Sequence, residues 1–125
     1  MNEEELLNFL ALKLEEGDFV PYQGLEAEKI MELERELGFE LPNFFRLFYL
    51  NFNGGESEDE VFYPLTAIPQ VIKELNIPKN YLPFFLNALE QIFLINPNGE
   101  VFCLDEGQLE SLDNNFSNWI FNYWE

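Results

Sequence analysis

The sequence has no histidine and only one cysteine. Without histidine, the chain cannot build Ser-His or Cys-His nucleophiles, or metal sites with imidazole ligands. Cys103 has no second cysteine with which to form an internal disulfide, which is typical of proteins of a reducing compartment. Its place in a Phe-Cys-Leu run predicts an inert core residue rather than a catalytic thiol.

Phosphate-binding loops are absent as well, since neither G-x-x-x-x-G-K-[ST] nor G-x-G-x-x-G occurs in the chain. The acids of residues 56–60 lack the D-x-[DN]-x-[DN]-G spacing of a calcium loop. Two carboxylates are enough to hydrolyse a glycoside, but among 24 Asp and Glu no pair stands out. We therefore expect no cofactor, no metal and no catalysis. A small carboxylate-dependent hydrolase is kept as the more distant of two alternatives.

Positive charge is scarce: six Lys and Arg stand against 24 Asp and Glu, for a net charge of −18. Such a surface repels nucleic acid and anionic lipid, and it attracts basic proteins. A net charge of about 2 to 8 already keeps a small domain soluble, so solubility alone does not require this excess. We expect a basic protein partner, with neither nucleic acid nor a membrane as a ligand.

Long apolar runs are also lacking, and none approaches the roughly 18 residues that span a bilayer. The first ten residues, MNEEELLNFL, are acidic where a secretion signal needs positive charge, which favours the cytoplasm. The chain of 125 residues is 47% hydrophobic and contains 14 Phe, enough for a core of its own. We therefore expect one domain over residues 1–125.

The chain is organised around residues 33–55, which read as a helix end, a break and a second helix. Gly38 is the expected residue just after the first helix, because glycine takes the left-handed conformation without a Cβ clash. Pro42 suits the first position of the next helix. Residues 44–52 are so apolar that we expect this helix to be buried on nearly every side, with the run Asn53-Gly54-Gly55 ending it.

The remaining pattern predicts an α+β fold. Helical spacing indicates helices over residues 3–16, 25–37, 68–75 and about 113–124, with 19–24 as a connector. Apolar runs of strand length occupy residues 61–63, 82–86, 92–95 and 101–104. Between the last two, Asn96-Pro97-Asn98-Gly99 is typical of a bulged hairpin turn. We expect a small, largely antiparallel sheet packed with about four to five helices.

The order of these segments resembles the SUKH superfamily, the Smi/Knr-type domain. The matching pieces are Glu36-Leu37-Gly38, Leu41-Pro42, residues 44–52, Asn53-Gly54-Gly55, Tyr63-Pro64-Leu65 to Ile68, residues 82–105 and residues 116–124. The resemblance thus covers about residues 22–124. The chain departs from the pattern at Ala88-Leu89-Glu90, where many members carry a Gly-Asp pair, so no function of that turn is carried over.

The resemblance implies a function as a binding protein. Bacterial SUKH domains are largely immunity proteins, each of which binds and blocks a toxin domain that is often a nucleic-acid-targeting enzyme. Fungal relatives regulate cell-wall synthesis through protein partners. We accordingly expect a non-catalytic module that neutralises a cognate toxin by covering its basic, substrate-binding face. A regulatory or scaffold interaction module is the nearer alternative.

Two acidic sets and two tyrosines are the candidate contacts with such a partner. They are the helix acids (Glu28, Glu32 and Glu36), the loop acids (Glu56, Glu58, Asp59 and Glu60), and Tyr22 and Tyr63. The helix acids lie four residues apart on one helix face, where like charges repel by about 0.2–0.5 kcal/mol per pair. The loop acids follow two glycines, and we expect an exposed, mobile loop. A plain solvated surface remains the alternative for both acidic sets.

Overall fold

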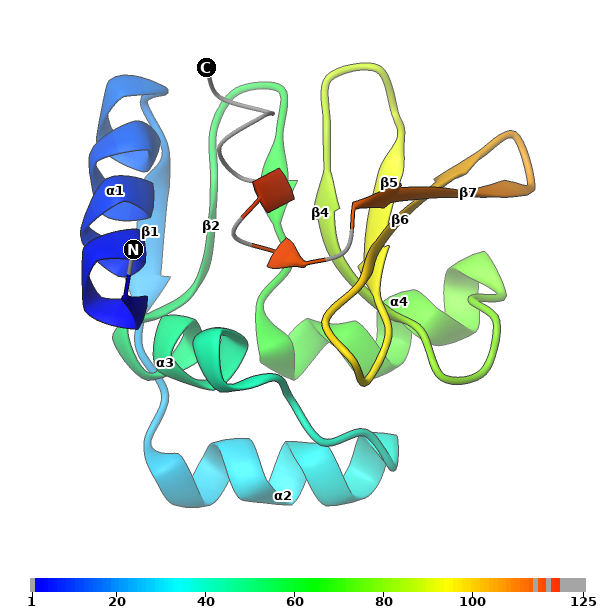
Figure 1. Ribbon diagram of the computed structural model, residues 1–125, viewed down its shortest axis with the longest axis horizontal. Coiled ribbons are helices and arrows are strands. Elements are labelled where there is room, and N and C mark those ends of the chain that lie inside the picture. Colours follow the sequence, from blue (N-terminus) through cyan, green and yellow to red (C-terminus); the bar gives the residue numbers. More distant parts are fainter. Residues whose placement is uncertain (1, 114, 117, 120–125) are drawn as a thin grey trace.

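An antiparallel sheet forms the centre of the computed structural model, which describes residues 2–113, 115–116 and 118–119 (Figure 1). Within these residues the sheet has seven strands that lie side by side in chain order, from β1 to β7. The strands are β1 (Val20–Gln23), β2 (Phe52–Glu56), β3 (Val61–Phe62), β4 (Leu82–Leu86), β5 (Ile92–Ile95), β6 (Val101–Asp105) and β7 (Gln108–Asp113). The α+β class is confirmed, and the sheet is larger than the small one expected.

One helix precedes β1, and the other helices before β4 lie in the β1–β2 and β3–β4 connections. In the described part of the chain they are α1 (Glu3–Glu16), α2 (Ala27–Leu37), α3 (Asn43–Asn51), the short 3-10 helix η1 (Leu65–Ala67) and α4 (Ile68–Leu75). Residues 116, 118 and 119 are helical as well, and the Asn118 N–H donates to the Asn115 carboxamide at 2.8 Å as an N-terminal cap. The rest of the helix expected up to residue 124 lies outside the described residues.

One face of the sheet carries the aromatic core. Phe62, Phe85, Phe93 and Cys103 lie directly opposite one another on β3 to β6, and all four are buried. Because directly paired residues of antiparallel strands share a face, this row defines the core face. The Trp119 ring packs against it, with ring centroids 5.1 Å from Phe93 and 5.9 Å from Phe85.

A bulge in β4 places two consecutive aromatic rings in this core. The register between β4 and β5 shifts between Pro83 and Phe85, so Phe84 is the additional residue of the pair. Phe84 contacts Phe45 of α3 at 5.2 Å between ring centroids, while Phe85 lies tilted against Phe62 at 4.5 Å. Strict alternation would have turned one of these two rings away from the core.

The joint between α2 and α3 is fixed by the half-buried carboxylate of Glu34. Gly38 takes the left-handed conformation at φ 63°, which confirms its predicted role at the end of α2. The Glu34 carboxylate then accepts the Leu41 N–H at 2.8 Å and the Arg46 guanidinium at 2.8 Å. Pro42 occupies the N-cap position, one residue earlier than predicted.

Helix α3 is less enclosed than the sequence suggests. Phe44, Phe45, Phe48 and Tyr49 are buried, but the Leu50 side chain is 39% exposed, so one face of the helix meets solvent. The prediction of burial on nearly every side was therefore wrong. The apolar run continues past the helix because Phe52 begins strand β2.

The Asn53-Gly54-Gly55 run is part of β2 and does not simply end the helix. The Asn53 carboxamide oxygen accepts the Leu65 N–H at 2.8 Å, which fixes the start of η1. Gly54 has φ 78°, and a Cβ there would lie 2.3 Å from the Phe62 carbonyl oxygen. At Gly55 a Cβ would lie 2.9 Å from the Val20 carbonyl oxygen. Both glycines are required by neighbouring strands that approach closely.

Two edge strands correct the predicted element boundaries. The expected connector over residues 19–24 contains β1, which pairs with β2. Residues 108–113 form β7, so Asp113 ends a strand where the last helix was expected to begin. The hairpin turn before β6 is confirmed, with Gly99 at φ 82° and its N–H donating to the Asn96 carbonyl at 2.9 Å.

Candidate partner-binding surface

Three turns of the sheet gather at one end of the molecule. Because the strands follow chain order, the connections β2–β3, β4–β5 and β6–β7 emerge at the same end of the sheet; in Figure 1 the first two lie at the top and the third projects at the upper right. Helix α1 also finishes there. Together, the end of α1 and the first two turns surround a hollow of about 370 Å³, lined by Gly17, Asp18, Ser57, Glu58, Asp59, Glu60 and Ala88. We call it the acidic hollow.

Most of the loop acids belong to the acidic hollow, in a compact turn where a mobile loop was expected. The Ser57 N–H donates to the Glu60 carbonyl at 2.9 Å, and the Glu60 N–H donates to the Ser57 hydroxyl at 3.2 Å. The Glu60 carboxylate reaches the β4–β5 turn, where it accepts the Ala88 N–H at 3.4 Å. Glu58 and Asp59 are exposed. Hydrogen bonds within the turn therefore hold in place the backbone that carries these two exposed carboxylates.

The two candidate tyrosines differ in their surroundings. Burial raises the pKa of Tyr22, and a side-chain hydrogen bond to Glu56 and the charge of that carboxylate raise it further. Tyr22 and Glu56 therefore lie together on β1 and β2. Tyr63 instead packs its side chain against the core, and burial raises its pKa. Its backbone carbonyl accepts the Tyr49 hydroxyl at 3.0 Å. Of the two, only Tyr22 joins the acidic candidates.

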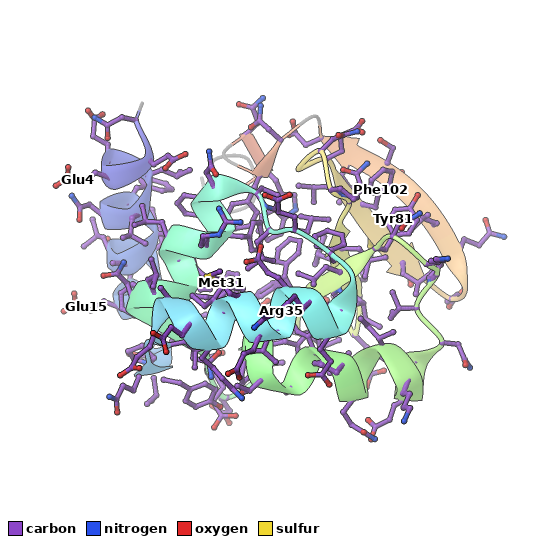
Figure 2. All side chains as sticks on the ribbon, turned by 90° about the horizontal axis from the view of Figure 1, so that it is seen from below. Glu4, Glu15, Met31, Arg35, Tyr81 and Phe102 are labelled. Atoms are coloured by element: carbon purple, nitrogen blue, oxygen red, sulfur yellow. The ribbon has the colours of Figure 1, made fainter. Side chains whose placement is uncertain are left out.

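The helix acids lie at the opposite end of the molecule. Glu28, Glu32 and Glu36 are exposed on α2, which runs along the lower edge in Figure 1, far from the acidic hollow. Positive charge is mixed with them, because the Lys29 Nζ lies 3.6 Å from the Glu32 carboxylate. Figure 2 looks onto this helix, and its labelled Arg35 is exposed as well. The helix acids and the loop acids, which were both predicted to contact the partner, thus lie at opposite ends of the structure.

Charge is distributed unevenly between the two ends. All six Lys and Arg lie in the described residues, and five of them sit on α2, α3, α4 or the loop after α4. The sixth, Lys13, pairs with Glu16 at 3.4 Å. Lys13 lies in the last turn of α1, whereas the three sheet turns and the residue after Gly17 carry only acids, namely Asp18, Glu58, Asp59, Glu60, Glu90, Asp105 and Glu106. Sequence reasoning missed Asp18, Glu90, Asp105 and Glu106, because only the strand order shows that their turns meet.

Neither a metal-binding cluster nor an activated thiol is present among the described residues. Among them, no group of three or more His, Cys, Asp or Glu is placed to hold a metal ion. Cys103 is buried, and burial, followed by the charges of Asp105 and Glu110, raises the pKa of its thiol. A raised thiol pKa disfavours the nucleophilic thiolate. Within the same part of the chain, no helix is both long and apolar enough to cross a membrane.

Comparison with known proteins identifies the family. A search of curated proteins gave no match. The model of the SMI1 / KNR4 family (SUKH-1) matches residues 24–122, which is most of the chain and nearly the range expected from the ordered segments. The matched range begins just before α2 and includes the α2–α3 joint, the Asn-Gly-Gly run and the sheet from β2 to β7. The chain therefore belongs to the SMI1 / KNR4 family (SUKH-1).

Proposed function

We propose that this protein is a non-catalytic immunity protein, which neutralises a cognate toxin by binding its basic face with the turn end of the sheet. The observation that carries the proposal is the uniform negative charge around the acidic hollow. A toxin that acts on nucleic acid needs a basic surface for phosphates, and the exposed carboxylates of Glu58 and Asp59 occupy that surface in their place. Family membership supports a binding role of this kind.

Charge supplies speed and orientation more than affinity. An exposed ion pair contributes only about 0–1 kcal/mol, so the acids act together with apolar contacts. Rim charges steer encounter and raise the association rate. Salt screens them beyond about 8–10 Å, so the parent protein should bind its partner more slowly at high salt.

The test compares two variants that remove the same number of charges. Asp18→Asn, Glu58→Gln and Asp59→Asn together alter the hollow, and Glu28→Gln, Glu32→Gln and Glu36→Gln alter α2. Asparagine tolerates the positive φ of residue 18, and Glu60 is kept because it bonds the β4–β5 turn. The partner is recovered from the native cell with this chain, identified by mass and purified.

Association rates and inhibition of the partner's activity are then measured at low and high salt. We expect the hollow variant to associate at least about tenfold more slowly at low salt, with a much smaller change for the α2 variant. Equal rates for parent and hollow variant would place the binding face elsewhere. A partner without toxicity would point to the regulatory module. Turnover by the pure protein, lost on one carboxylate-to-amide change, would show an enzyme.

A further inference from the structure

A row of aliphatic side chains crosses the sheet on the face opposite to the aromatic core. The strand registers place seven residues directly opposite one another from β1 to β7: Val20, Glu56, Val61, Leu86, Ile92, Leu104 and Leu109. We call them the outer row. Each lies next to a residue of the core face along its own strand, so the outer row points to the other side. Six of its seven members are aliphatic.

None of these side chains is buried. Val20 is 64% exposed and Leu109 is 40% exposed at the two edges, and the four aliphatic residues between them are half-buried. Nearer the β5–β6 turn, the same face of the sheet is covered. Leu94 is fully buried there, and the Tyr81 ring lies edge-on to the Phe102 ring at 5.0 Å between centroids (Figure 2). The loop after α4 therefore covers this face near the β5–β6 turn and leaves the outer row open.

The length of the row suits a protein interface. Six strand spacings of about 4.8 Å make it roughly 29 Å long. A standard interface buries about 800 Å² on each partner, which corresponds to a patch of about that width. Contiguous apolar patches on a protein surface commonly mark binding sites. Scattered exposed residues such as Leu12 or Leu75 on the helices have no such alignment.

The acidic residues next to the outer row indicate which kind of protein would bind there. Val61 directly follows Glu60, Leu86 and Ile92 flank the β4–β5 turn with Glu90, and Leu104 directly precedes Asp105. Glu56 lies within the row itself. None of the six Lys and Arg of the chain lies in the row or in these turns. A second copy docked on this face would bring like charges together, whereas a basic protein would pair with them.

We propose that the outer row is the apolar part of the docking surface for the basic partner, with the acidic hollow as its charged rim. The proposal rests on the proposed function, and it adds the surface and the chemistry of the contact. The partner presents an apolar ridge flanked by Lys and Arg. Burial of the row supplies the affinity that exposed ion pairs do not.

The test uses the purified partner and two matched triple variants. Val20→Thr, Leu104→Thr and Leu109→Thr alter the row with a residue that strands favour. Leu12→Gln, Met31→Gln and Leu75→Gln remove exposed apolar side chains from three helices. Binding is measured by titration calorimetry at several temperatures, because burial of apolar surface makes the heat-capacity change negative.

We expect the row variant to bind about 100-fold more weakly, with a less negative heat-capacity change, and the helix variant to stay within about threefold of the parent. Should the triple variant not fold, Leu109→Lys at the exposed edge tests the same contact through repulsion. Parent-like affinity in the row variants would overturn the proposal, as would a dimer of this chain that the row substitutions dissolve. A partner that binds through the row but keeps its toxic activity would refute the proposed function alone.

Discussion

Replacing Gly54 with alanine is expected to break the contact between β2 and β3, while the same change at Gly38 is mild. Both glycines have positive φ, 78° at Gly54 and 63° at Gly38. Alanine in this conformation costs about 1–2 kcal/mol. Alanine also lowers the conformational entropy of the unfolded chain, which offsets about 0.4–1 kcal/mol of that cost. Gly38→Ala should therefore lower the free energy of unfolding by about 0–1.6 kcal/mol, because nothing lies within 4 Å of its Cβ position to add a steric cost.

At Gly54, alanine has a steric cost in addition to the cost of positive φ. Its Cβ would lie 2.3 Å from the Phe62 carbonyl oxygen, which is backbone and can move only if β3 leaves its place beside β2. Overpacking of this kind costs about 1–3 kcal/mol. We therefore expect Gly54→Ala to lower the free energy of unfolding by about 1–4.6 kcal/mol, which is about 1–3 kcal/mol more than Gly38→Ala.

Urea unfolding, followed by far-UV circular dichroism and by tryptophan fluorescence, measures both variants against the parent. In thermal unfolding, a loss of 1 kcal/mol corresponds to about 4 °C for a chain of this length. Gly54→Ala should then lower the midpoint by about 4–18 °C and Gly38→Ala by no more than about 6 °C, with a difference of about 4–12 °C between the two variants. Equal losses in the two variants would refute the reasoning, because the backbone conformation alone would then account for the need for glycine.

Three further predictions concern single contacts. Glu34→Ala removes the acceptor of the Arg46 guanidinium and should cost about 1.5–3 kcal/mol in urea unfolding, with little further loss when Arg46→Met is added. Tyr49→Phe deletes the hydroxyl that donates to the Tyr63 carbonyl and should cost about 1 kcal/mol at neutral pH. Burial raises the pKa of Tyr49 above its unfolded value, so above about pH 10 the unfolded state binds fewer protons and the parent loses stability; this alkaline loss should be shallower in Tyr49→Phe. Gly99→Val places a β-branched residue at φ 82° and should cost about 1–3 kcal/mol, and an unchanged denaturation midpoint would contradict this view of the turn.

Local signals in the sequence were sufficient where the structure is locally determined. The Asn96–Gly99 turn, the end of α2 at Gly38 and the helix of residues 3–16 depend on residues within a few positions of one another. The edge strands β1 and β7 depend on distant partners instead. Val20 pairs with Glu56, and β7 is a polar strand whose pairing with β6 carries a bulge. β1 has only four residues and contains Pro21, and the two leucines of β7 lie three positions apart, so neither has a clear strand pattern.

The candidate surface was predictable only in part for the same reason. The density of acids in residues 56–60 pointed to the β2–β3 turn, and the structure places most of them in the acidic hollow. Asp18 joins them because α1 ends beside that turn. The helix acids on α2 have as strong a charge pattern, yet they lie at the other end. Charge density along a chain does not say at which end of a sheet a segment emerges.

The chain-ordered sheet also has a consequence for the route by which the protein folds. Residues 82–113 hold four strands joined by three short turns, so their pairings close small loops at little entropic cost. The pairing of Val20 with Glu56 must instead enclose α2 and α3. Local contacts form early in topologies of low contact order. We expect the C-terminal meander to nucleate folding and β1 to join last, so a nascent chain acquires its full sheet only after the final strands leave the ribosome.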